Sequence, residues 1–385
     1  MKRIKLFLAL TAGAFLLCSC GGNTGTSLPS PIIIEEETHS NDPGTGNEEG
    51  SNKPSTPIIT EPDLPPEEGM VRSKLTNEWI SPELANRRPL AVMTPNQSAA
   101  IPHYNLSKAS ILYEANVEGN MSRMLAIYED WDNLEKIGNV RSLRAYYAVW
   151  ATEWDAILVH YGGPWMIDEV LERPNHESID GTYTGGDAFF RSTDRSSPHN
   201  AYANGPGIKQ AVIDKGMSLE DRGLTDSYHY KFTAKDKPNT LEQYETGARN
   251  ATKIDMTGAY PLTRCYFEYN ENDGLYYRSQ HLSGASDGPH IDAVNGEQLT
   301  FSNVIVQFVH QYAIDDHGYL AIDCSDSGKD GWFFTRGKGI HINWEKGEDD
   351  FSATRYYDDQ GNEIVLNTGK TMVCIVEIGD TVSFK

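Results

Sequence analysis

The chain has 385 residues and is strongly acidic, with 33 Lys and Arg against 55 Asp and Glu and a formal net charge of -22. This charge would repel a phosphate backbone, and no Lys/Arg-rich run supplies a basic patch, so the sequence argues against a nucleic-acid partner. A hydrophobic content of 38% favours a globular protein over a membrane-spanning or fibrous one. At about 150 residues per domain, the length predicts roughly two domains.

The first nineteen residues have the pattern of an export signal. Lys2, Arg3 and Lys5 precede an apolar stretch that ends at Leu17 and is too short for a spanning helix. The run Leu17-Cys18-Ser19-Cys20-Gly21-Gly22 resembles the bacterial lipobox, in which a cysteine receives a diacylglycerol before cleavage. An ordinary secretory signal is disfavoured, because no Ala-x-Ala pattern ends the apolar run. Residues 1–19 are therefore expected to be a lipoprotein signal, and Cys20 to be the lipid anchor on the extracytoplasmic face of a bacterial membrane.

Residues 20–75 are predicted to follow as an anchor and a disordered acidic tether. Between residues 21 and 70 there is no Phe, Trp or Tyr, but there are eight prolines and ten Asp or Glu against the single Lys53. Such a segment cannot bury a core. Residues 71–385 still carry 29 Lys and Arg against 45 Asp and Glu, so the body itself is acidic.

The body reads as an α+β fold, with an α/β layered domain over 76–223 and a β-rich domain over 224–385. Short apolar runs at Pro89–Thr94 and Ala156–Tyr161 indicate strands buried on both faces. Helical spacing over Ser142–Trp154 predicts a helix that buries one face, with a stripe of core residues at Leu143, Tyr147, Trp150 and Trp154. From about Thr225 onward, strand patterns follow one another.

A hairpin with a two-residue turn at Gly119-Asn120 is predicted to carry a polar network. In that register Arg123 shares a face with Glu114 and Glu118, within reach of an ion pair. Glu114 and Glu118 are too far apart along a strand, at about 13 Å, to act as a glycosidase pair.

Arg141 and Arg144 lie at the predicted start of the helix, three residues apart and on one side. Cations are mildly disfavoured beside the positive end of a helix dipole, so an anion should lie there. One candidate is the pair Glu114 and Glu118, which would make an internal network. The other is an anionic ligand held by the guanidinium groups.

Two further segments are candidate parts of the same site. His160 ends a buried strand, and Gly162-Gly163 lead into a predicted helix over Trp165–Glu172, the position where ligands bind in open α/β sheets. A long loop from Ser178 to Gly207 contributes further candidates, whose alternative role is to pin the loop by hydrogen bonds. These candidates are Arg191, Arg195, His199 and Asn200.

The sequence gives little support for metal or nucleophile chemistry. His290 and Asp292 share a strand face, with His281 and His310 elsewhere in the same domain, but no third ligand is defined, so neither metal nor cofactor is expected. Serine-nucleophile motifs are missing. Three cysteines remain after the signal and anchor, and each lies in a strand-like run typical of buried residues: Cys265, Cys324 and Cys374.

Several segments resemble the YerB-type lipoproteins, a two-domain family of unknown function. For the N-terminal domain these are PLAVMTPN (89–96), ILYEANVEGNMSRMLAIY (111–128), IGNVRSLRAYY (137–147), DAILVHYGG (155–163) and RSSPHNAY (195–202). For the C-terminal domain they are PHIDAVNGEQLTFSNVIVQ (289–307) and LNTGKTMVCIVE (366–377). The chain departs from the family pattern at Asn139, at Pro164 and at Thr94-Pro95, where Ile-Asp is typical. The resemblance implies an envelope lipoprotein and points to the same polar residues.

These observations favour a non-catalytic, membrane-anchored envelope lipoprotein that binds an anionic wall-related ligand at an Arg141/Arg144/His160 cleft. One alternative is a cell-wall hydrolase or transferase that uses His160 or His199 as acid or base. Another is a scaffold for a second envelope protein.

Overall fold

The computed structural model describes residues 33–35, 62–226, 228–284 and 286–385. The signal, Cys20 and most of the expected tether lie outside these residues. Residues 62–75 were expected in the tether but are part of the folded body: Leu75 is buried, and Asp63 accepts a hydrogen bond from Trp79. The folded part therefore begins before residue 76.

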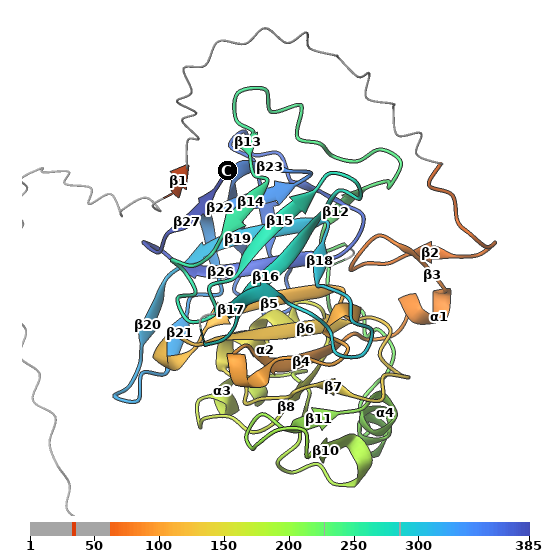
Figure 1. The fold of residues 1–385 in the computed structure, drawn as a ribbon. Coiled ribbons are helices and arrows are strands. Elements are labelled where there is room, and N and C mark those ends of the chain that lie inside the picture. Colours follow the sequence, from red (N-terminus) through yellow and green to blue (C-terminus); the bar gives the residue numbers. More distant parts are fainter. Residues whose placement is uncertain (1–32, 36–61, 227, 285) are drawn as a thin grey trace, which may run out of the picture.

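One large mixed sheet runs through the body and takes strands from both sides of residue 224 (Figure 1). At its centre β26 pairs in parallel with β19 on one side and with β5 on the other. In spatial order the strands are β13 (Arg249–Asn250), β23 (Lys338–Lys346), β22 (Asp326–Thr335), β19 (Asn303–Val309), β26 (Thr371–Glu377), β5 (Ile111–Asn116), β6 (Ser122–Tyr128), β4 (Leu90–Pro95), β8 (Ile157–His160) and β9 (Ser178–Asp180), with β24 (Arg355–Tyr357) beside β23.

A second sheet packs over the first and is mostly antiparallel. Its strands are β1 (Ile33–Glu35), β27 (Val382–Phe384), β14 (Lys253–Asp255), β15 (Tyr266–Asn270), β16 (Leu275–Ser283) and β17 (Ser286–Pro289), with β18 (Thr300–Phe301) beside β16. Smaller groups are β10 (Phe189–Arg191), β11 (Ala201–Ala203) and β7 (Ile137–Gly138); β2 (Val71–Arg72) and β3 (Trp79–Ile80); β12 (Lys231–Thr233) and β25 (Val365–Asn367); and β20 (Gln311–Ala313) and β21 (Leu320–Ile322).

Helices are few and short in the described part of the chain. They are α1 (Pro82–Ala85), α2 (Ala145–Thr152), α3 (Ile167–Leu171) and α4 (Gly205–Asp214), with 3-10 turns η1 (Ser98–Ala100), η2 (Leu106–Lys108), η3 (Glu118–Asn120) and η4 (Gly186–Ala188). The fold is thus rich in strands. The stretch 178–207, expected as one long loop, contains β9, η4, β10 and β11 and the start of α4.

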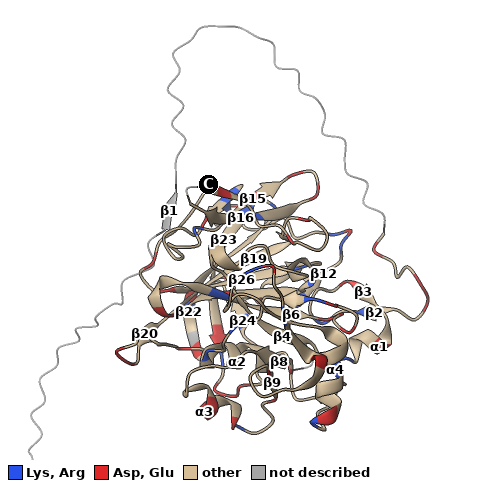
Figure 2. Ribbon diagram, turned by 60° about the horizontal axis from the view of Figure 1, so that its bottom comes forward, with Lys and Arg blue, Asp and Glu red and all other residues tan. Residues whose placement is uncertain are grey.

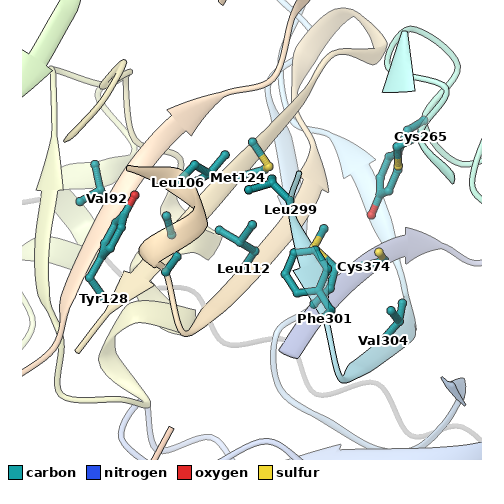
Figure 3. Close-up of a cluster of buried hydrophobic side chains, with 14 of the residues drawn as sticks. Val92, Leu106, Leu112, Met124, Tyr128, Cys265, Leu299, Phe301, Val304 and Cys374 are labelled. Atoms are coloured by element: carbon teal, nitrogen blue, oxygen red, sulfur yellow. The ribbon is translucent and has the colours of Figure 1, made fainter. Parts of the chain in front are cut away.

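The main sheet is buried on both faces, which explains its continuous apolar strands. Along β4, Leu90 and Val92 join one core, while Ala91 and Met93 join the other. The first core fills the space against the second sheet and α4, and Figure 3 shows residues from both halves of the chain in it. The second core contains α2.

The stripe predicted over Ser142–Trp154 is buried, as expected, but the helix is shorter than predicted: α2 covers Ala145–Thr152, so Leu143 and Trp154 lie just outside it. Leu143, Tyr147, Trp150 and Trp154 are all buried. The Tyr147 hydroxyl donates hydrogen bonds to backbone oxygens of Ala115 in β5 and Arg123 in β6, at 2.9 and 2.8 Å. The helix is thereby fixed across the β5–β6 hairpin.

The turn of that hairpin corrects the predicted register. Ala115 pairs with Arg123 and Asn116 with Ser122, and Val117 donates to the Met121 oxygen, so the loop has three residues, Glu118 to Asn120. Because side chains alternate between the faces of a strand, a slip of one residue exchanges the faces. Arg123 therefore does not share a face with Glu114, contrary to the prediction.

Candidate functional site

The segment that carries Arg141 and Arg144 lies along the ends of two neighbouring strands, β4 and β8. Arg141 donates its backbone N–H to the Met93 oxygen of β4 at 2.9 Å. Tyr161 donates to the Arg141 oxygen at 3.1 Å, and Leu143 to the Gly162 oxygen at 3.0 Å. These hydrogen bonds place the arginines beside the carboxyl ends of β4 and β8.

Glu118 holds two of the neighbouring arginines. Arg144 Nε donates to Glu118 Oε2 at 2.9 Å, and a second nitrogen of the same guanidinium group contacts Oε1. Arg123 lies 3.7 Å from the same carboxylate and donates to the Ser142 oxygen. Burial alone would raise the pKa of Glu118, but the hydrogen bond and charge of Arg144 and the charge of Arg123 lower it. Arg144 is thus part of an internal ion-pair network.

Arg141 is different, because its side chain has no hydrogen bond or ion pair with any described residue. The side chain is half-buried. Burial lowers its pKa, and the charges of Arg144 and Arg191 lower it further, while Glu118 opposes them. The pKa of buried Arg123 is lowered to about 10 by burial and then by Arg144. We call Arg123, Arg141, Arg144 and Arg191 the arginine cluster; among the described residues, the carboxylate that forms ion pairs with it is that of Glu118.

Arg191 reaches this cluster from β10. Its guanidinium lies 4.8 Å from the centre of the Tyr161 ring, and it donates to Asn200 Oδ1 at 2.9 Å. Acidic and basic positions are interspersed over the rest of the molecule in Figure 2. The excess of cations at the cluster therefore arises from packing, since no basic run exists in the sequence.

His199 and Asn139 lie next to the cluster, and each has one buried side-chain atom without a hydrogen-bond partner among the described residues. Asn139 donates from Nδ2 to the backbone oxygens of Ala100, at 3.2 Å, and His199. Asn139 Oδ1 and His199 Nδ1 are buried and have no partner in the described part of the molecule. The pKa of His199 is lowered by burial and then by Arg141, Arg195 and Arg123, so its imidazole is neutral at pH 7.

Arg195 fixes the backbone on the far side of this group. It donates to the oxygens of Ala100 and, at 3.0 Å, Pro102, and it contacts Asp194. It therefore has the pinning role that was the alternative to ligand binding.

His160 is close to the cluster in the fold but is not electrostatically coupled to it. It is buried; Nδ1 lies 2.9 Å from the Gly162 oxygen, and Nε2 has no partner among described residues. Burial lowers its pKa, and the charged groups that act on it are Asp180 and Lys215. Gly163 packs so closely on Ile167 that an added Cβ would lie 2.4 Å away.

Glu114 lies on the opposite face of the sheet, in a buried network that sequence reasoning missed. Its Oε2 accepts from Arg278 Nη2 at 2.8 Å, and both side chains are fully buried. Arg278 also donates to His290 Nδ1, and His290 Nε2 lies 2.8 Å from His103 Nδ1. Glu114 and Arg278 are 164 residues apart in sequence, so no local pattern signals their pairing.

His290, which the sequence offers as a candidate metal ligand, belongs to this network. Asp292 instead accepts hydrogen bonds from the backbone N–H groups of Asn105 and Ser107, at 3.0 and 2.8 Å. In the residues that the structure describes, no three His, Cys, Asp or Glu side chains gather as a metal site requires. Cys265, Cys324 and Cys374 are buried and unbonded to one another.

Comparison with known proteins places this arrangement in a wider group. Residues 75–218 match the family model "Protein of unknown function (DUF3048) N-terminal domain", and residues 254–373 match the corresponding C-terminal domain. "Putative lipoprotein YerB" of Bacillus subtilis (strain 168) is 28% identical over 281 residues, which cover 72% of this chain and 78% of that protein. A crystal structure of the Bacillus subtilis YerB protein superposes with a TM-score of 0.67 at 26% identity, covering 80% of this chain and 96% of that chain. Within the described ranges, no helix is long and apolar enough to cross a membrane.

Proposed function

Because the chain belongs to the YerB-type lipoprotein family, we propose that it is a lipid-anchored envelope protein that binds an anionic ligand at the arginine cluster. The anchor rests on the signal pattern before Cys20 and on the name of the Bacillus subtilis relative. The ligand rests on the geometry of the cluster.

The observation that carries the proposal is the unpartnered guanidinium of Arg141. A half-buried cation beside like charges is normally paired, because burial weakens its hydration and the low local dielectric strengthens repulsion. Here Glu118 already holds Arg144 and neighbours Arg123, so it is not free to pair with Arg141. An anion that binds between Arg141 and Arg191 would relieve the repulsion, and a guanidinium fork suits phosphate or carboxylate oxygens.

Because the rest of the protein is acidic, this local excess of cations is stronger support for an anion-binding site. A protein with net charge -22 would repel anions in general, so an anion has to be drawn by a defined group of cations. The cluster supplies four guanidinium groups against one carboxylate. Such a site selects for ligands with a compact negative charge.

Arg141→Gln tests the proposal. At low ionic strength the full chain in detergent should melt at a higher temperature with phosphate or pyrophosphate than with chloride, because ligand at a hundredfold over Kd adds about 2.7 kcal/mol to stability. Arg141→Gln should lose this rise. Without ligand it should melt at or above the parent's temperature, because the repulsion from Arg144 and Arg191 is removed.

Arg355→Gln is the matched control. Arg355 is also half-buried, but Glu363 and Asp226 pair with it at 3.0 Å each. This variant should melt lower and keep the response to phosphate. If Arg141→Gln melts well below the parent and no anion raises the melting temperature of either protein, Arg141 is a structural residue and the proposal is wrong.

A further inference from the structure

Two loops next to the arginine cluster are held together by one carboxylate. Asp180 Oδ1, at the end of β9, accepts hydrogen bonds from the backbone N–H groups of Gly162 and Thr182, each at 2.8 Å. The two loops also touch directly, since a Cβ added to Gly162 would lie 3.2 Å from Thr182 Oγ1. Asp180 therefore holds the starts of both loops together, and the loops continue from there to Trp165 and to Tyr183.

Both loops end in large aromatic side chains that are exposed. Trp165 is 73% and Tyr183 is 87% exposed, the two highest values among the aromatic side chains classed as exposed. Neither ring stacks on another aromatic ring or on a cation in the described part of the molecule. Exposed rings of this size beside polar groups are typical of binding sites, where an aromatic face packs on a flat apolar surface of the ligand.

Tyr161 connects these loops to the arginine cluster. Its backbone N–H bonds to the Arg141 oxygen, and its ring lies under the Arg191 guanidinium. On its other side the ring packs on Gly181, where an added Cβ would lie 2.6 Å from it. The aromatic loops and the cations are thus parts of one continuous surface.

An exposed aromatic face beside cations suits a ligand whose anionic group is attached to a ring with apolar C–H faces. The guanidinium groups can hold the anionic group while the Trp165 or Tyr183 ring packs on such a face. Inorganic phosphate has no such face, so it would contact the cations alone.

We infer that the ligand of the arginine cluster is an anionic sugar, a sugar ring bearing phosphate or carboxylate. The anionic group lies at Arg141 and Arg191, and the sugar ring packs on Trp165 or Tyr183. This inference rests on the proposed function and adds the chemical class of the ligand.

Calorimetric titration of the full chain in detergent with four probes tests this inference. The probes are glucose 1-phosphate, glucuronate, glucose and inorganic phosphate. One or both anionic sugars should bind at least tenfold more tightly than inorganic phosphate, and glucose alone should bind far more weakly. The stronger of glucose 1-phosphate and glucuronate identifies the anionic group. Trp165→Ala or Tyr183→Ala should remove most of the tenfold gain and leave the affinity for inorganic phosphate unchanged.

Tyr228→Ala is the matched control, because Tyr228 is 42% exposed and contacts Lys231, Arg355 and Glu363, none of which belongs to the cluster or to the two loops. It should change no affinity. If phosphate binds as tightly as both anionic sugars, or if the loop variants bind all probes like the parent, the sugar inference is wrong while the anion site stands. If no anion binds and Arg141→Gln has no effect, both the inference and the proposed function are wrong.

Discussion

At the scale of single residues, Arg278 joins the two halves of the chain through a buried hydrogen-bond series. The Pro95 oxygen can only accept, so His103 Nε2, 2.7 Å away, carries a proton. His103 Nδ1 then accepts from His290 Nε2, and His290 Nδ1 accepts from Arg278. This assignment, inferred from the network, leaves both imidazoles neutral and gives every ring nitrogen a partner.

Glu114→Gln tests how much this network depends on its ion pair. Removing one partner of a buried pair leaves the other charge uncompensated, so the free energy of unfolding should fall by about 3–5 kcal/mol. Denaturant titration measures it. The control is Asp287→Asn in the exposed pair with Arg264, where the loss should be about 0–1 kcal/mol. A loss below about 1 kcal/mol for Glu114→Gln would contradict an ionised pair at this site.

At the scale of elements, the β5–β6 hairpin shows what local sequence can and cannot predict. Gly119 and Asn120 both have positive φ, at 70° and 56°, so the residues that favour a turn are where the chain turns. They did not specify the loop length, and a difference of one residue decided which face carries Glu114. The local grouping of arginines was visible in the sequence. The sequence did not show that Arg144 is paired while Arg141 is not, or that Glu114 pairs with Arg278. These pairings depend on contacts between distant segments.

Trp150→Ala tests the packing of α2 on this hairpin. Trp150 is 1% exposed and stacks parallel to the Tyr113 ring at 5.7 Å. Loss of its side chain should cost about 3–5 kcal/mol of unfolding free energy. Trp165→Ala removes an exposed indole and should stay within about 0.5 kcal/mol in the same denaturant titration. Equal effects of the two substitutions would show that α2 does not bury its stripe.

At the scale of the whole molecule, histidines with lowered pKa make the fold sensitive to acid. Burial lowers the pKa of His103 from 6.5 to about 4, and the hydrogen bond to Pro95 only partly opposes it. Between these two pH values the unfolded chain binds more protons than the folded one. The contribution of neutral His103 to the free energy of unfolding is therefore complete above pH 6.5 and is lost as the pH falls. The other histidines shifted in this direction are His160, His176, His199, His229 and His290.

His103→Gln measures the contribution of one such group. From pH 7 to about 4.5 the parent should lose about 2 kcal/mol through His103 alone, and the variant should lose that much less. The parent and the variant have to be compared, because the pH profile of the parent alone contains other groups. Burial raises the pKa of Glu129 to about 7, so Glu129 makes the fold more stable as the pH falls, opposite to His103. His317→Gln is the control, since that side chain is 82% exposed. Parallel pH profiles of the parent and His103→Gln would refute the assignment.

The position of β26 has a consequence for the order of events during synthesis. This strand lies in the middle of the main sheet, between β19 and β5, yet it comes from residues 371–377. A ribosome makes β26 long after β5, so one edge of β5 stays unpaired while the segments between them are made. Exposed apolar edges pair readily with other chains, and such distant pairing is slow. A nascent chain of this protein therefore needs protection from aggregation until β26 emerges and pairs with β5.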